Sequence, residues 1–349
     1  MKNKIILRMT GFIVIVMFLF SLVSCKKEKL QKIRVAEVAH SVFYAAQYVA
    51  IEEGYFEEEG LKIELVNANG ADKVTAALLS GDVQIGLQGP EPTIYLYNNN
   101  HNNYLINFAQ VTRTDGSFIF GREKIEDFDV SMLAGKSILG GRVGGVPEMT
   151  LEYVLKNAGL TVVRDAEGSV SELRKEVNVR TDISFGAMAG SFIAGEGDFT
   201  TLFEPTATEL VLGNKGYLLA SVGELAGEVS YTAYSTSLKY FENNKDVLEK
   251  FTRAIYRGQM FIFNHTDKEV AEIMKKQFPD IDIVNLTEVV KRYREVNAWM
   301  KTPVFSEVGY NKLQDIMLAA SQLDKTVKFE TIVDVDIAKK VVNSFKNEK

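Results

Sequence analysis

Short apolar stretches alternate with helical patterns along the first third of the chain. The stretches predicted as strands lie at 33–38, 62–66 and 83–87. Apolar side chains recur at helical spacing over 42–53 and 72–80, and a glycine follows each of these segments, as is common where helices end. Strands that alternate with helices at short connections indicate βαβ units and a mostly parallel sheet.

The same order of short motifs occurs a second time. The second copy predicts a strand at 136–139, helices at 149–157 and 186–194, and a strand at 199–203. Gly-Leu, Gly-Asp and Glu-Pro-Thr follow one another in both copies, at 60–61, 81–82 and 91–93 and again at 159–160, 197–198 and 204–206. The second copy is longer, and residues 163–176 are interpreted as an insertion. The repeated order favours two similar α/β lobes over a chance match of motifs.

Two extended stretches, at 117–121 and 229–235, are expected to cross between the lobes. Lobe I would then comprise residues 33–116 plus 236–349, and lobe II would comprise 122–228. The last third of the chain is mainly helical and is expected to cover lobe I, with N-caps predicted at Asn244 and Thr287 and helices at 244–263, 267–277, 286–300 and 309–323. The predicted fold class is α/β, with two lobes that each contain a mostly parallel sheet flanked by helices.

The N-terminus has the pattern of an export signal. Lys2, Lys4 and Arg8 precede an apolar run at 11–23, which is short for a membrane span of roughly 20 residues. The run ends in the sequence LVSC, which resembles a bacterial lipobox with Cys25 as the lipidated residue.

This resemblance implies three segments before the body. They are a lipoprotein signal peptide at 1–24, the lipid-anchored Cys25 and a short tether at 25–32. The alternative is an uncleaved membrane anchor. The lipid anchor and the uncleaved anchor both place the body at the extracytoplasmic face of the cell membrane. In the first case, the lipid would be its only attachment to the membrane.

Composition limits the possible functions. The 349 residues carry a formal charge of −6, and loss of 1–24 would remove three positive charges and leave −9. An acidic chain is not suited to non-specific nucleic-acid binding. A single cysteine excludes an internal disulfide framework and any multi-cysteine zinc or iron–sulfur site, and we expect no cofactor or metal.

Four stretches are shared with a known family: AAQYVAIEEGYFEEEGLKIEL, LLSGDVQIGL, GRVGGVPEMTLEYVL and LFEPTA. They resemble the solute-binding proteins of ABC importers, in particular the NMT1/THI5-like and SsuA-like groups. Known members take up thiamine-pyrimidine precursors, riboflavin, sulfonates, taurine or nitrate. The resemblance implies a type II periplasmic-binding fold, a monomer that holds its ligand between two lobes, and an ABC permease with its ATPase as partners.

The ligand is expected beyond the carboxyl ends of the strands, where loops lead into helices. After the first predicted strand the candidate ligand-binding residues are His40, Ser41, Phe43 and Tyr44. Free backbone N–H groups at such a helix start can take polar ligand atoms. Each residue also has a structural interpretation, since His40 can be a hydrogen-bonded structural residue, Ser41 an N-cap, and Phe43 or Tyr44 part of the core.

The other strand ends supply the rest of the predicted site. A glycine-rich turn at 140–145 precedes a helix and can hold an anion, although it lacks the Gly-Lys-Ser/Thr of a P-loop. Arg142 in this turn either pairs with a ligand anion or solvates the edge of the lobe. The remaining candidates are Gln88, Gly89, Glu91, Arg113, Gly144, Glu148, Phe185, Glu204, Tyr231 and Tyr234.

Charge helps to choose between ligand classes. Glu91, Glu148 and Glu204 all fall in loops predicted to face the cleft. Unpaired carboxylates repel small anions, so nitrate or a simple sulfonate is disfavoured unless Arg113 or Arg142 neutralises them. A neutral or cationic nitrogen heterocycle fits better, because its N–H groups donate to carboxylates and its faces stack on aromatic rings. The alternative is that the glutamates cap helices.

The predicted function is capture of such a heterocycle by lobe closure and delivery to a permease. One alternative is the same fold with an organosulfonate, taurine or nitrate as ligand. A second is a lipoprotein that senses a ligand and presents it to a receptor. A third is an enzyme similar to the pyrimidine synthases of the NMT1/THI5 group. We expect no enzymatic activity, because those enzymes carry a cysteine-rich iron-binding run and Cys25 is the one cysteine here.

Overall fold

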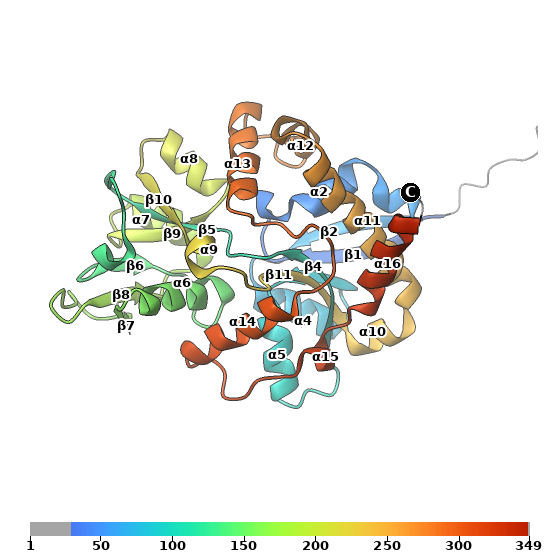
Figure 1. Cartoon of the computed structure of the whole chain (residues 1–349), viewed down its shortest axis with the longest axis horizontal. Helices are drawn as coiled ribbons and strands as arrows, with labels where there is room; N and C mark the ends of the chain where they lie inside the picture. Colours follow the sequence, from blue (N-terminus) through green and yellow to red (C-terminus); the bar gives the residue numbers. More distant parts are fainter. Residues whose placement is uncertain (1–28, 348–349) are drawn as a thin grey trace, which may run out of the picture.

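A five-stranded sheet forms the centre of lobe I (Figure 1). The computed structural model describes residues 29–347. The strands of this sheet are β1 (Gln31–Glu37), β2 (Leu61–Asn67), β3 (Ile85–Gln88), β4 (Leu105–Thr112) and β11 (Thr232–Ser237). Their order is β2-β1-β3-β11-β4, with β1, β2 and β3 parallel and β11 antiparallel to both its neighbours.

A six-stranded sheet forms the centre of lobe II and repeats this plan. Its strands are β5 (Ser117–Gly121), β6 (Ser137–Leu139), β7 (Thr161–Arg164), β8 (Glu176–Arg180), β9 (Phe199–Phe203) and β10 (Tyr217–Ser221), in the order β10-β5-β9-β6-β8-β7. Without the edge strand β7, the order matches lobe I strand for strand, and antiparallel β5 takes the place of β11. The predicted α/β fold class with two lobes is confirmed.

The chain passes between the two sheets through residues 113–116 and 227–231, which we call the crossovers. The stretches predicted to cross are displaced from these positions. Residues 117–121 form β5 inside the sheet of lobe II, and 232–235 belong to β11 inside the sheet of lobe I. Extended segments look alike in sequence whether they pair or cross, because both contain apolar residues without helical spacing.

Helices flank both sheets. Those that follow the strands of lobe I are the 3-10 turn η1 (Val42–Tyr44), α2 (Ala45–Glu52), α3 (Tyr55–Glu58), α4 (Ala71–Ser80) and α5 (Glu91–Asn98). Those of lobe II are η2 (Val130–Leu133), α6 (Val146–Asn157), η3 (Phe185–Ala187), α7 (Met188–Ile193), α8 (Thr206–Leu212) and α9 (Val222–Ala226). No helix in residues 29–347 has the length and apolar character needed to cross a membrane.

Strands β4 and β5 are buried on both faces. All eight residues of β4 and all five of β5 are buried, as is usual where helices lie on both sides of a sheet. In β3, a side chain at Gly86 would come within 2.7 Å of Val74 and Leu78. Glycine at this position therefore lets α4 approach the sheet closely.

The C-terminal helices pack mainly on lobe I and reach lobe II at two places (Figure 1). They are α10 (Leu238–Asn243), α11 (Lys245–Asn264), α12 (Asp267–Met274), α13 (Ile283–Glu295), α14 (Glu307–Ala319), α15 (Phe329–Ile332) and α16 (Asp336–Asn347). Arg292 of α13 pairs with Glu204 in lobe II. At the far end of α14, Lys156 of lobe II donates to the carbonyl of Ala319, and Arg164 donates to that of Ala320.

One predicted helix start is wrong. The N-cap of α13 is Asp282, whose carboxylate accepts from the backbone N–H groups of Val284 and Asn285. Thr287 lies inside the helix, and its hydroxyl donates to the carbonyl of Ile283. Asn244 does precede α11, but its side chain makes no capping bond there and donates instead to the Tyr240 carbonyl. The signal peptide, Cys25 and tether residues 25–28 lie outside the described residues.

A single glycine sets the approach of α11 to α2. A Cβ at Gly258 would lie 2.2 Å from the backbone oxygen of Ala46, which cannot move without shifting α2. We expect Gly258→Ala to lower the free energy of unfolding by about 1–3 kcal/mol, measured by urea denaturation. The control is Gly190→Ala, at an exposed position of α7, where the added methyl meets nothing within 4 Å. Equal stability of the two variants would contradict this account.

Candidate functional site

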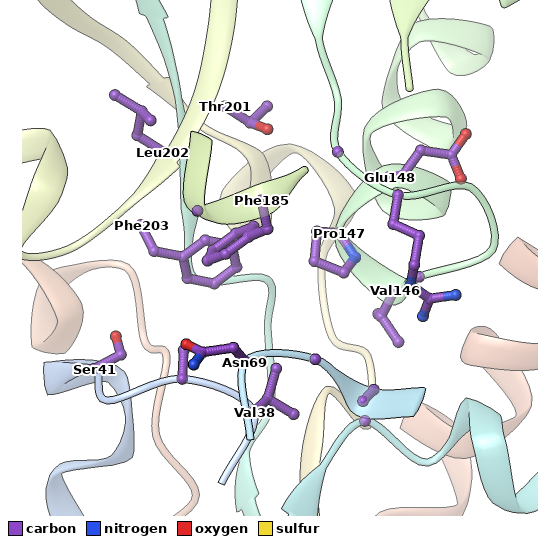
Figure 2. Close-up of a pocket in the computed structure, with 18 of the residues that line it drawn as sticks. Val38, Ser41, Asn69, Val146, Pro147, Glu148, Phe185, Thr201, Leu202 and Phe203 are labelled. Atoms are coloured by element: carbon purple, nitrogen blue, oxygen red, sulfur yellow. The ribbon is translucent and has the colours of Figure 1, made fainter. Parts of the chain in front are cut away.

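A cavity of about 510 Å³ lies between the lobes, at the carboxyl ends of their strands. Its volume is within the usual range for small-molecule sites, roughly 300–1,000 Å³. Lining residues come from within the segments 38–44, 69–73, 89–91, 140–148, 184–189, 201–206 and 231–232. Figure 2 shows Ser41 and Asn69 on the side of lobe I, facing Phe185, Phe203 and Pro147 of lobe II.

Aromatic rings form part of the wall. Phe185 and Phe203 meet edge to face with their centroids 5.5 Å apart. Phe185 is 46% exposed, whereas Tyr44 and Tyr231, which also line the cavity, are almost fully buried. A flat ligand ring could stack on such a wall, because aromatic groups prefer offset or edge-on contacts at these distances.

The lobes touch each other across the cleft. The Ser41 hydroxyl donates to the Glu204 carbonyl over 2.8 Å, and the Tyr95 hydroxyl donates to the Gly144 carbonyl over 3.2 Å. Ser41 is also the N-cap of η1, since its Oγ accepts from the backbone N–H of Phe43. Both contacts join uncharged groups, and each is therefore a modest contribution to the arrangement in which the lobes meet.

Glu91 is a carboxylate of the cavity wall that lacks an ion pair and a hydrogen-bond partner for one of its oxygens within the described residues. Its side chain folds back over Gly89, where any Cβ would lie 2.0 Å from Oε2. The residue is 2% exposed, and Oε2 has no hydrogen-bond partner within the part of the chain that the structure describes. Burial raises the pKa of Glu91 to about 7, although backbone N–H groups and the charge of Arg142 lower it slightly.

Glu148 is neutralised inside lobe II. Its carboxylate accepts from the backbone N–H of Gly144 over 3.1 Å and from Nε of Arg164 over 3.3 Å. Arg164 also pairs with the buried Glu152. Burial, with the neighbouring Glu152 carboxylate, raises the pKa of Glu148 above its usual range. Figure 2 shows the Glu148 carboxyl turned away from the centre of the cavity.

The charge of Glu204 is matched as well. Its carboxylate also caps the start of α8, which was the alternative interpretation of the glutamates. It pairs with Arg292 of α13, and its carboxylate accepts from both the backbone N–H and the hydroxyl of Thr208 in α8. The predicted repulsion of anions by three glutamates is therefore wrong in extent, because Glu91 alone of the three lacks an ion pair within the residues that the structure describes.

His40 lines the cavity, but its ring is held by other protein groups. Nδ1 lies 2.9 Å from Oε1 of Glu37, and Nε2 lies 3.0 Å from the carbonyl of Gln277. Both neighbours are acceptors, so satisfying both requires the doubly protonated ring. The ring also stacks on Phe278 at a centroid distance of 4.6 Å. This geometry is that of a structural histidine at the edge of the cavity.

Nine of the predicted site residues line the cavity and five do not. Those that line it are His40, Ser41, Tyr44, Gly89, Glu91, Glu148, Phe185, Glu204 and Tyr231. Phe43 is instead buried among Tyr44, Phe203, Tyr231 and Tyr293, and Tyr234 is buried in lobe I, where its hydroxyl donates to Gln47.

The other three have structural partners. The Gln88 amide bonds with Thr75 and Ser235 inside lobe I. Arg113 pairs with Glu228, and its carbonyl accepts from the N–H of Val229, so that it ties the two crossovers together. The carbonyl of Gly144 accepts from the Tyr95 hydroxyl, and its N–H donates to the Glu148 carboxylate.

The loop after β2 is the part of the site that sequence reasoning missed. Asn69, Gly70, Ala71 and Lys73 all line the cavity. The rule that ligands lie beyond strand ends, applied to the predicted strand 62–66, points to the same loop. The signal was therefore present in the sequence. Arg142 also lines the cavity, from the opposite lobe.

Sequence comparison agrees with this architecture. Residues 42–269 match the family model described as NMT1/THI5 like. The chain belongs to the NMT1/THI5-like family. A relative in this comparison is YtlA of Bacillus subtilis (strain 168), named as a binding protein, which is 36% identical over 329 residues covering 94% of this chain and 95% of YtlA.

Solved structures of low sequence identity share the fold of this family member. The ligand-binding component of an ABC-type import system from Staphylococcus aureus superposes with a TM-score of 0.69 at 14% identity, over 89% of this chain and 99% of that one. The alkanesulfonate-binding protein SsuA from Xanthomonas axonopodis pv. citri, bound to MOPS, gives 0.66 at 19% identity, over 88% and 99%. The desulfurization enzyme DSZB gives 0.63 at 11%, over 90% and 99%. The type II periplasmic-binding fold is thereby established.

The two acceptors around His40 predict a pH-dependent contribution to stability. The hydrogen bond to Glu37 raises the pKa of His40 above 6.5, although burial opposes it. A pKa raised by folding stabilises the folded state fully below the unfolded-state value, and that stabilisation is lost as pH rises through the folded-state value.

We therefore expect the stability difference between wild type and His40→Gln to be larger at about pH 5.5 than at about pH 9, measured by urea denaturation. The control is His101→Gln, at an exposed turn after α5. A difference that stays constant or grows with pH would show that His40 is not held as the imidazolium.

Proposed function

We propose that this protein is the extracytoplasmic solute-binding lipoprotein of an ABC importer. It captures a small nitrogen heterocycle, such as a thiamine-pyrimidine precursor or a riboflavin-like molecule, between its lobes and delivers it to a permease with its ATPase. The proposal includes lipidation at Cys25, a monomeric state and no catalytic activity. Its support is the family membership, the two-lobed fold and the cavity at the strand ends.

Glu91 is the observation that carries the choice of ligand. A buried carboxylate oxygen without a hydrogen-bond partner is unfavourable, and a ligand that donates to it removes the penalty. Ring N–H and exocyclic amino groups are such donors. The neighbouring rings of Tyr44, Phe185 and Tyr231 suit the flat face of the same ligand.

Organosulfonates and taurine are the second candidate class, because Lys73 and Arg142 also line the cavity. Nitrate is less suitable, since its four heavy atoms would leave most of the 510 Å³ unfilled. An alkanesulfonate without an amino group offers nothing to Glu91, so it is distinguished from a heterocycle by whether binding requires this carboxylate. Taurine carries an ammonium group that can also donate to Glu91.

Two alternatives concern the role of the protein rather than its ligand. A receptor-bound sensor would share every feature described above, and loss of solute uptake on gene deletion separates transport from sensing. The enzyme alternative has a precedent for the fold in DSZB. Within residues 29–347, no cluster of three or more His, Cys, Asp or Glu side chains could hold a metal ion.

Ligand class can be tested with protein purified without refolding. We expect native mass spectrometry to show a retained heterocycle. In a thermal-shift panel, we expect pyrimidines or flavins to raise the thermal midpoint of the protein more than sulfonates do. A ligand at 100 times its Kd stabilises by about 2.7 kcal/mol. At about pH 8, Glu91→Gln should weaken binding by roughly 10- to 100-fold, since a hydrogen bond to a charged group contributes about 1.5–3 kcal/mol.

The control for this variant is Glu209→Gln, at an exposed position of α8 away from the cavity. We expect Glu91→Gln to fold normally, because it removes a buried charge while keeping the shape of the side chain. Sulfonates that bind wild type and Glu91→Gln equally, with no heterocycle bound, would contradict the proposed ligand class.

Lobe closure can be tested by small-angle scattering. We expect the ligand to decrease the radius of gyration of the wild-type protein. Tyr95→Phe removes the bond to the Gly144 carbonyl and should weaken closure by about 0.5–1.5 kcal/mol, so that more ligand is required. Tyr97→Phe, at an exposed position of the same helix, is the matched control. A tight ligand that leaves the radius unchanged would exclude closure.

A further inference from the structure

Lys73 and Arg142 are two cations that face one cavity from opposite lobes. Lys73 comes from the first turn of α4 in lobe I, and Arg142 comes from the turn before α6 in lobe II. Both are exposed, and no ion pair joins either of them to a carboxylate in residues 29–347. The Arg142 side chain donates only a long bond to the carbonyl of Val143.

The other ionisable groups of the wall are already matched. His40 faces Glu37, Glu148 faces Arg164, and Glu204 faces Arg292. Asp72 is the carboxylate nearest to Lys73 in sequence, and its Oδ1 lies over the backbone of Gly70 at the start of α4. What is left uncompensated in the cavity is therefore two cations and the single carboxyl of Glu91.

The negative and the positive groups of the cavity differ in burial. Glu91 is buried, whereas the two cations are exposed to solvent at the edge of the cavity. Arg142 lies close enough to Glu91, across the cleft, for its charge to affect that carboxyl. A ligand that is only a hydrogen-bond donor would satisfy Glu91 and leave the cations unmatched, and a simple anion would do the reverse.

We propose that the natural ligand carries both kinds of group: an N–H donor that binds Glu91 and an anionic substituent that sits between Lys73 and Arg142. The proposal rests on the proposed function and specifies its ligand class. The anionic substituent can be a carboxylate, a sulfonate or a phosphate, because all three accept from ammonium and guanidinium groups.

The placement of one cation on each lobe couples this substituent to closure. When the lobes approach, two like charges enter the same cavity and oppose the movement. An anion between them converts the repulsion into attraction. The anionic group thus has a higher affinity for the closed form than for the open form, which is the condition for a ligand to drive a conformational change. A neutral heterocycle binds Glu91 in lobe I without this gain.

Scattering from the ligand-free protein tests the repulsion directly. We expect the double variant Lys73→Gln/Arg142→Gln to be more compact than wild type at low salt. About 1 M salt, with a screening length near 3 Å, should remove the difference. The matched control is Lys215→Gln, which removes an exposed charge outside the cavity and should leave the radius of gyration unchanged. An identical radius for wild type and double variant at both salt concentrations would overturn the coupling.

A matched pair of probes tests the substituent. The probes are 4-aminopyrimidine and 4-aminopyrimidine-5-carboxylate, with ethanesulfonate as an anion that lacks the donor. We expect the carboxylate to bind wild type at least tenfold more tightly than 4-aminopyrimidine, measured by calorimetry. The double variant should lose this advantage, measured as the ratio of the two affinities within that variant, while it still binds 4-aminopyrimidine. Its thermal midpoint in the absence of probe checks that it folds.

The outcomes separate this inference from the proposed function. If 4-aminopyrimidine binds as tightly as its carboxylate, or the advantage persists in the double variant, the anionic subsite is wrong and the heterocycle remains supported. If ethanesulfonate binds and neither aminopyrimidine does, the proposed ligand class fails together with the inference. Absence of binding by the carboxylate probe at millimolar concentration also counts against the inference.

Discussion

A carboxylate removed from water requires a cation or several hydrogen-bond donors, and the interpretation of this cleft depends on how its glutamates meet that requirement. Glu148 and Glu204 are matched by Arg164 and Arg292, and each also accepts from a backbone N–H group. Glu91 has neither an ion pair nor a partner for Oε2 within the described residues. Glu91, the unmatched group, is where we propose that a ligand completes the structure, and a count of acidic residues in the cavity would not have singled it out.

The contrast between Glu91 and Glu204 is informative because the two occupy the same motif in the repeated lobes. Both stand in Glu-Pro-Thr after a strand that ends at the cleft. In lobe II, α13 from the C-terminal part of the chain brings Arg292 to the carboxylate. No arginine or lysine forms an ion pair with Glu91 among the described residues, and its carboxylate folds over Gly89 instead. The repeat therefore produces one strand end whose glutamate is paired with an arginine and one whose glutamate has no ion pair within the described residues.

Most of the fold could be predicted from the sequence, since the alternation of strands with helices is a local pattern. The paired lobes followed from repeated motifs, and the strand-end rule selected most of the cavity wall. The crossovers were displaced because pairing partners are not visible in an extended segment. The partners of Arg113, Glu148 and Glu204 could not be predicted either, because Glu228, Arg164 and Arg292 are distant in sequence and are brought near only by the packing of the lobes.

The same distant contacts show where movement is possible. Arg113 and Glu228 hold the two crossovers to each other, and Ser230 bonds to Gly309 and Ser306 at the start of α14. Charged and buried contacts thus concentrate at the crossovers and along the C-terminal helices. At the cleft itself, the lobes are joined by the neutral hydrogen bonds of Ser41 and Tyr95 and by the ion pair between Arg292 and Glu204. Each neutral bond contributes about 0.5–1.5 kcal/mol, and a ligand shifts the lobes toward the closed form only by its difference in affinity for the two forms.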